Sequence, residues 1–89
     1  MFRFKRGVKV SYNLQGYIFF LSQRYKKASR EERALIRQCC AQTDYPDAVF
    51  EFVTGSKGAT WVCGKHFISE STLERAVKIY YIEMAARLK

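Results

Sequence analysis

The sequence predicts a mainly α-helical protein of one domain, with four to five helices after an extended or short β, basic N-terminal segment. Apolar side chains recur at three- and four-residue spacing along most of the chain after residue 12, and typical helix-start residues precede these stretches. The 89 residues suffice for one hydrophobic core and are too few for two. With 48% hydrophobic and 16% aromatic residues, one Pro and five Gly, the composition excludes a disordered or low-complexity chain.

The N-terminal part is expected to combine a basic extended arm, residues 1–12, with a helical hairpin, residues 13–43. The arm alternates apolar and polar positions, as strands do, with a break near Gly7. We expect Asn13 to cap a helix that ends near Lys27, because its apolar positions follow one helical face: Leu14, Tyr17, Ile18, Leu21 and Tyr25. The alternative interpretation is a turn at residues 13–16 followed by a strand at residues 17–21.

The second expected helix begins with a capping box. Ser29 stands three residues before Glu32, so each side chain can pair with the backbone N–H of the other, and the helix should end near Gln42. Its inner face would consist of Ala34, Leu35, Cys39 and either Ile36 or Cys40. Residues 43–47 indicate a turn, with Pro46 where its missing N–H is tolerated. The helix that follows, residues 47–54, would bury Val49, Phe50 and Val53.

Two further helices complete the unit expected for residues 44–88. Gly55 and Gly58 end the preceding helix, and a short helix from Ala59 to His66 follows. Ser69 can cap a long final helix that reaches about Leu88. The apolar stripe of this last helix is Leu73, Ala76, Val77, Tyr80, Met84 and Leu88.

The segment from Ala59 to Lys78 has the features of a helix-turn-helix. Such a motif needs a small residue where its two helices cross, an apolar residue in the turn and a cap before the second helix. Cys63, Ile68 and Ser69 occupy these positions. The inner contacts would come from Val62, Leu73 and either Ala76 or Val77. An ordinary pair of helices with a good cap is the alternative.

Residues 52–77 resemble the helix-turn-helix of the stage III sporulation protein D type of bacterial transcription regulators. The stretch from Phe67 to Leu73, Phe-Ile-Ser-Glu-Ser-Thr-Leu, carries most of the resemblance, which covers a third to two-fifths of the chain. Two positions depart from the pattern, since Phe67 stands where such turns usually have Gly and His66 where they have an apolar residue. The first 43 residues resemble small open reading frames of bacterial mobile elements.

The resemblance implies specific contacts with double-stranded DNA. The candidate base contacts on the second helix are Ser69, Glu70, Ser71, Glu74, Arg75 and Lys78. Arg75 is the strongest of them, since a guanidinium pairs bidentately with guanine. Glu70 and Glu74 would accept from cytosine, or simply place negative charge near the start of a helix. The candidate phosphate contacts are Lys57, Thr60 and Lys65, with Ser71 and Lys78 as further ones. The arm, with Arg3, Lys5, Arg6 and Lys9, would either enter a minor groove or stay solvated.

The charge of the chain is concentrated at one end. The first 30 residues carry eight basic and no acidic side chains, whereas residues 31–89 carry eight of each, so the whole net charge of +8 lies in the first third. Such asymmetry favours a polyanionic partner, although a solubilising basic tail has the same composition. We therefore expect a small sequence-specific DNA-binding protein, either a transcriptional regulator or a mobile-element accessory factor. A protein–protein interaction module and an RNA-binding protein are the alternatives.

Other classes of function are not expected. Cys39, Cys40, Cys63 and His66 could be combined into a zinc site, but adjacent cysteines suit tetrahedral coordination poorly, so no metal is predicted. No nucleophile, base and orienting acid occur together, so we expect no enzyme, no cofactor and no small-molecule substrate. The longest apolar run, Tyr17 to Leu21, is too short for a membrane span, and a cytoplasmic protein is expected. A lone module of this size often dimerises to gain affinity, so a homodimer is an open alternative, with Tyr81 as a candidate interface residue.

Overall fold

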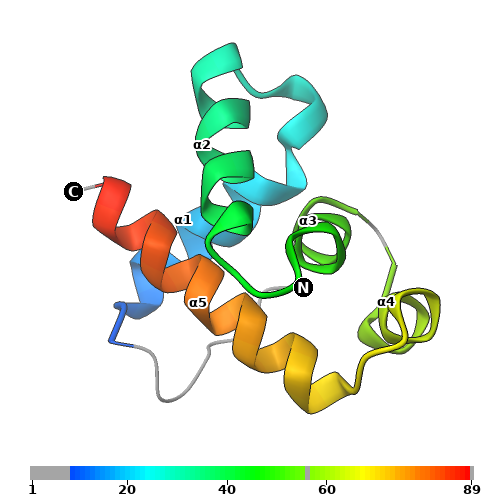
Figure 1. The fold of residues 1–89 in the computed structure, drawn as a ribbon. Helices are drawn as coiled ribbons and strands as arrows, with labels where there is room; N and C mark the ends of the chain where they lie inside the picture. Colours follow the sequence, from blue (N-terminus) through cyan, green and yellow to red (C-terminus); the bar gives the residue numbers. More distant parts are fainter. Residues whose placement is uncertain (1–8, 56, 89) are drawn as a thin grey trace.

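The computed structural model describes residues 9–55 and 57–88, and this part of the chain folds into five α-helices and one short 3-10 helix, with no strand (Figure 1). The mainly helical fold predicted from the sequence is therefore confirmed. Most of the expected extended arm, residues 1–8, lies outside the described residues. In chain order the elements are α1 Tyr12–Gln23, η1 Tyr25–Lys27, α2 Arg30–Ala41, α3 Pro46–Thr54, α4 Ala59–His66 and α5 Glu70–Leu88.

Helix α1 confirms the helical interpretation of residues 13–27 and excludes the turn and strand. Its cap is Ser11, whose hydroxyl accepts from the N–H of Leu14 at 3.2 Å, so the expectation that Asn13 caps this helix was wrong. Ser11 precedes the helix, whereas Asn13 already has helical backbone and cannot play this part. The α-helix also ends earlier than expected, at Gln23, whose side chain donates to the carbonyl of Val53 at 2.9 Å.

The buried face of α1 is shifted from the one that its apolar spacing predicts, since its buried residues are Gln15, Ile18, Leu21 and Ser22. Ile18 and Leu21 are buried, and Tyr25 is half-buried with its ring edge-on to Phe50 at 5.0 Å. Tyr17, expected on the same face, is 52% exposed. A helix with aromatic or aliphatic residues at seven of the ten positions from 12 to 21 has several apolar faces, and only the packing partner selects one.

Helices α2 and α3 begin as their local signals predict. The capping box at Ser29 is complete, with Ser29 Oγ accepting from the N–H of Glu32 at 3.1 Å and the Glu32 carboxylate accepting from the N–H of Ser29 at 2.9 Å. Pro46 is the first residue of α3. The inner face of α2 consists of both Ile36 and Cys40 together with Cys39; Ala34 is exposed, because it lies about 200° around the helix from Ile36.

Helix α5 crosses the molecule and contacts each of the other four α-helices (Figure 1). Helices α1 and α2 each pack against both α3 and α5. Because it is covered from several sides, α5 buries more than one stripe: Leu73, Ala76, Val77, Tyr80, Tyr81, Met84 and Ala85. Tyr81, considered from the sequence as an interface residue, is only 4% exposed and is therefore part of the core.

Polar side chains inside the core are paired. Ser22 donates to the carbonyl of Ile18 at 2.7 Å, and its oxygen lies 2.6 Å from the hydroxyl of Tyr80. Since the one hydroxyl proton of Ser22 is used, Tyr80 is the donor, and this bond ties α1 to α5. In the part of the chain that the structure describes, no buried side-chain nitrogen or oxygen lacks a hydrogen-bond partner. No helix in that part is both long and apolar enough to cross a membrane.

Candidate nucleic-acid interface

The second half of the chain forms a compact group of three helices. Helices α3, α4 and α5 contact one another pairwise, and only residues 67–69 separate α4 from α5. The helices begin and end within one residue of the positions expected from the sequence. The candidate site is the outer surface of α4, this connection and the first half of α5.

The connection between α4 and α5 turns through a left-handed residue. Phe67 has φ 58° and ψ 43°, and it is the one non-glycine residue with positive φ among those described. The N–H of Ile68 donates back to the carbonyl of Cys63 at 3.2 Å, which closes the end of α4. A side chain in this conformation costs roughly 1–2 kcal/mol relative to glycine. The Phe67 ring, 93% exposed, recovers almost none of this through burial.

Small and apolar side chains pack beneath this turn. Val62 and Cys63 are buried on α4, and Ile68 is half-buried against the core. On α5, Leu73 is buried together with both Ala76 and Val77, so the sequence alternatives at these two positions are both correct. The small Cys63 therefore stands on the inner side of the short helix, as expected.

Ser69 caps α5 as predicted. Its oxygen accepts from the N–H of Thr72 at 3.1 Å, and its hydroxyl donates to Thr72 Oγ1 at 2.8 Å. The other candidate base contacts lie on the side of α5 that faces away from the core. Glu70, Ser71, Glu74 and Arg75 are exposed, and Lys78 is half-buried with its ammonium 3.6 Å from the Glu74 carboxylate.

Two of the candidate phosphate contacts lie beside Trp61, to which the sequence analysis gave no role. The ammonium groups of Lys57 and Lys65 each lie 5.3 Å from the centre of the Trp61 ring, which is 46% exposed. Thr60 is exposed in the first turn of α4. The four-residue spacing of Lys57, Trp61 and Lys65 is the sequence signal that could have revealed this group. Of the basic arm, Lys9 is exposed, while Arg3, Lys5 and Arg6 lie outside the described residues.

A carboxylate joins α3 to the end of α4. Glu51 accepts from Lys65 Nζ, and its other oxygen lies 3.0 Å from Nε2 of His66. Hydrogen bonds from Lys65 and His66 hold the pKa of Glu51 below its usual range. His66 and Lys65 thus join the end of α4 to α3 through one carboxylate.

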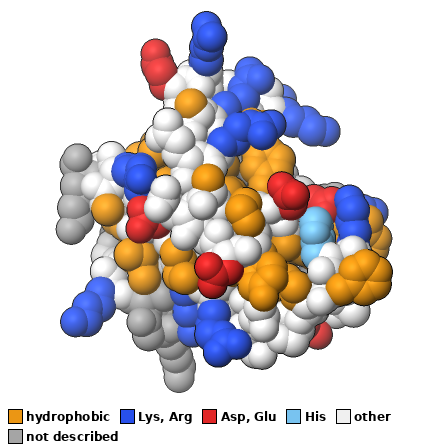
Figure 2. Space-filling model, in the orientation of Figure 1, with side chains coloured by type: hydrophobic (Ala, Val, Ile, Leu, Met, Phe, Trp, Pro, Cys, Tyr) orange, Lys and Arg blue, Asp and Glu red, His pale blue; other side chains and the backbone are white. Residues whose placement is uncertain are grey.

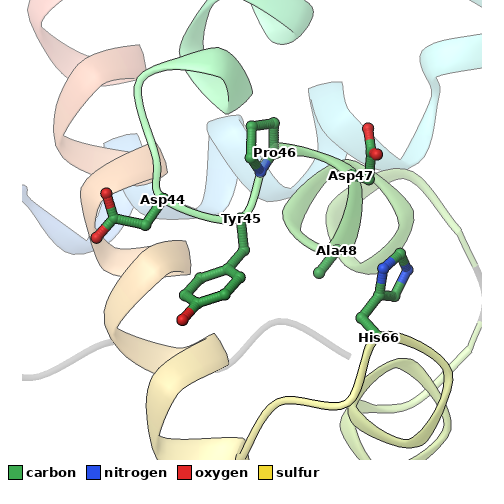
Figure 3. A pocket seen from close by; sticks show the side chains of 6 residues that line it. All are labelled: Asp44, Tyr45, Pro46, Asp47, Ala48 and His66. Carbon is green, nitrogen blue, oxygen red and sulfur yellow. The ribbon is translucent and has the colours of Figure 1, made fainter.

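A shallow pocket of about 230 Å³ lies beside this bridge, between the start of α3 and the end of α4 (Figure 3). It is lined by Asp44, Tyr45, Pro46, Asp47, Ala48 and His66. In Figure 3 the carboxylates of Asp44 and Asp47 lie on opposite sides of the pocket, so they do not converge on one ligand position. Pockets that enclose small molecules are usually larger and more apolar.

The cysteines belong to the core. Cys39 and Cys40 lie on α2 and Cys63 on α4, and all three are buried. Burial raises the pKa of Cys39 to about 11 and that of Cys40 to about 12. Among the described residues, His, Cys, Asp and Glu form no group of three or more that could hold a metal ion.

Comparison of the chain with protein-family models, with curated proteins and with solved structures finds no match.

The basic residues are distributed unevenly over the described surface. The candidate site has nearly balanced charge, with Lys57, Lys65, Arg75 and Lys78 opposed by Glu51, Glu70 and Glu74. A larger excess lies on η1 and the adjoining parts of α1 and α2, where Figure 2 shows basic side chains gathered at the upper right. Between positions 24 and 37 the chain carries six basic side chains and only two acidic ones, Glu31 and Glu32; the basic residues are Arg24, Lys26, Lys27, Arg30, Arg33 and Arg37.

Proposed function

We propose that this protein binds double-stranded DNA with sequence preference, as a small transcriptional regulator or mobile-element accessory factor. The observation that supports this most directly is the connection between α4 and α5. A short helix, a three-residue turn with a left-handed first residue and a capped second helix are the parts of a helix-turn-helix. Helix α3 packs against both α4 and α5, so the unit consists of three helices.

In this proposal the first half of α5 lies in the major groove. Ser71, Glu74 and Arg75 point away from the core there, whereas Leu73 and Ala76 hold the helix to the rest of the protein. Arg75 reads guanine through a bidentate pair, and Glu70 or Glu74 accepts from cytosine. The half-buried Lys78 and the lysines beside Trp61 contact phosphates and set the position of the helix.

Base preference tests this assignment. The preferred duplex is selected first, and affinities for it and for its single-base variants are then measured by fluorescence anisotropy. Arg75→Ala should reduce discrimination at one base pair by about 1–3 kcal/mol and leave the other positions unchanged. Arg87→Ala is the matched control, because Arg87 is an exposed arginine near the other end of α5, paired with Glu83.

The basic arm is expected to act differently. The double change Lys5→Ala with Arg6→Ala should weaken binding to all sequences alike and flatten the dependence of affinity on salt. Binding that keeps its salt dependence after this change would remove the arm from the interface.

A protein–protein interaction module is the second candidate, favoured by the apolar side chains that stay exposed. Trp61 lies in the first turn of α4 and Phe67 directly follows its last residue, while Ile79 and Ile82 are 39% and 47% exposed on α5. If Arg75→Ala and the arm variant were silent in DNA binding while a protein partner was lost, this second function would replace the first. An RNA hairpin in the same titration tests the third candidate, and sedimentation of the free protein tests whether it is a homodimer.

A further inference from the structure

Three arginines form a row on α2, far from the surface proposed to read DNA. Arg30, Arg33 and Arg37 are separated by three and then four residues, so they share one face of the helix, and all three are exposed. The row begins at the end of α2 that lies opposite the start of α5 in the molecule (Figure 1). Lys26 and Lys27 on η1 and Arg24 adjoin it.

Two of these guanidinium groups are held in place by the protein. Arg33 Nε donates to the carbonyl of Ala28 at 3.1 Å. Arg37 Nε donates to the hydroxyl of Tyr25 at 2.6 Å, and its central carbon lies 4.8 Å from the centre of the Phe50 ring. Within residues 9–55 and 57–88, neither arginine has a carboxylate within ion-pair distance. Their terminal nitrogens therefore remain available to an anion outside the protein.

A guanidinium fixed through Nε is suited to phosphate. It offers the donors of its two terminal NH2 groups as a fork, with less entropy lost on binding than a free side chain. From Arg30 to Arg37 the helix rises about 10 Å, which is the axial rise of about three phosphates of one DNA strand. The row thus matches a partner whose anionic groups repeat along a line, and a single small anion would use only part of it.

The balance of charge on the α4–α5 surface adds a second argument. Non-specific affinity for DNA comes from neutralised phosphates, and a surface with four basic and three acidic side chains supplies few of them. We propose that Arg30, Arg33 and Arg37 form a second surface that binds the sugar–phosphate backbone of duplex DNA, separate from the base-reading surface of α5. This inference rests on the proposed function, because it assigns DNA as the partner.

The experiment compares salt dependence with base preference. Affinity for a random-sequence duplex is measured by fluorescence anisotropy across a salt series, and discrimination is measured on the selected duplex. R33Q/R37Q should make the slope of log affinity against log salt shallower by roughly 2, about 0.9 for each lost phosphate contact, with base preference intact. R33K/R37K should restore the slope. R30Q removes one exposed arginine of the row and should make the slope shallower by about half as much.

The matched control is R87Q/K89Q, which removes the same charge from the C-terminal end of the chain. A slope change in this control equal to that of R33Q/R37Q would reduce the effect to net charge and overturn the proposal. So would a wild-type slope in a folded R33Q/R37Q protein, or a change seen with an RNA hairpin but absent with duplex DNA. The two proposals fail separately. Base preference without a role for Arg33 and Arg37 overturns only this inference, and a slope that depends on them without base preference overturns only sequence reading by α5.

Discussion

Replacing Phe67 with glycine should stabilise the protein, although it deletes a large apolar side chain. The left-handed backbone of Phe67 costs roughly 1–2 kcal/mol that glycine avoids. The greater freedom of glycine in the unfolded chain offsets about 0.5–1 kcal/mol of this gain. Because the Phe67 side chain is 93% exposed, the loss of buried area is close to nothing. The expected net effect of Phe67→Gly is therefore an increase of about 0.5–1 kcal/mol in the free energy of unfolding.

Urea and thermal denaturation measure this effect. For a domain of this size the melting temperature should rise by roughly 2–8 °C. Phe67→Ala separates ring from backbone, since it removes the ring and keeps Cβ in the left-handed conformation, and it should change stability little. Gly64→Ala is the complementary control, because Gly64 is an exposed helical residue and an added Cβ meets nothing within 4 Å. It should stabilise α4 by about 0.5–1 kcal/mol.

Two results would refute the reasoning about this turn. If Phe67→Gly destabilised the protein while Phe67→Ala did not, residue 67 would not have positive φ in solution, and the helix-turn-helix interpretation would lose its main support. If both changes destabilised the protein equally, the Phe67 ring would be packed against another part of the protein in solution and would not be exposed.

Three further predictions concern the interior and the Glu51 bridge. Ser22→Ala should lower the free energy of unfolding by about 1–3 kcal/mol, because it leaves the buried Tyr80 hydroxyl unpaired, whereas Tyr80→Phe should lower it by only about 0.5–1.5 kcal/mol. Equal losses of stability in urea denaturation would contradict the assigned direction of the hydrogen bond between these two residues. The pKa of Glu51 is lowered in the folded protein, so the stability that Glu51 contributes is complete above pH 4.5 and is lost as the pH falls through the lower folded pKa. The difference in denaturation midpoint between wild type and Glu51→Gln should therefore shrink below pH 4.5. A difference that stays constant with pH would exclude this bridge as its cause. Because burial raises the pKa values of Cys39 and Cys40 to about 11 and 12, both thiols should resist iodoacetamide at neutral pH until the protein unfolds, and rapid labelling of the native state would show that α2 opens.

The helix boundaries that the sequence predicted well are those with a local cause. The capping box at Ser29, Pro46 at the first position of α3 and the Ser69 cap depend on residues within four positions of one another. At the start of α1 the prediction named only Asn13, and the cap is Ser11, two residues earlier; both residue types favour this position, and the pattern of apolar residues does not distinguish them. Capping depends on which residue leaves the helical conformation, and Ser11, with ψ 157°, does so.

The buried faces were harder to predict because they depend on partners distant in sequence. Tyr17 was expected inside and is exposed, and Tyr81 was expected outside and is buried. The single stripe assumed for α5 suits a helix at the surface of a protein. Here α5 contacts four other helices, so residues on two of its sides are covered. No property of residues 70–88 by themselves distinguishes a surface helix from a central one.

The same limit applies to charge, with a consequence for function. The sequence locates the net charge in the first third of the chain, and it suggests an anionic partner without saying where on the fold that partner would bind. It cannot say that Arg24 to Arg37 would gather at one end of the fold while the surface of α4 and α5 stays nearly neutral. A helix placed in a groove by specific contacts needs little charge of its own if another surface holds the backbone. Affinity and specificity would then come from different helices, and variants of α2 and α5 should separate them.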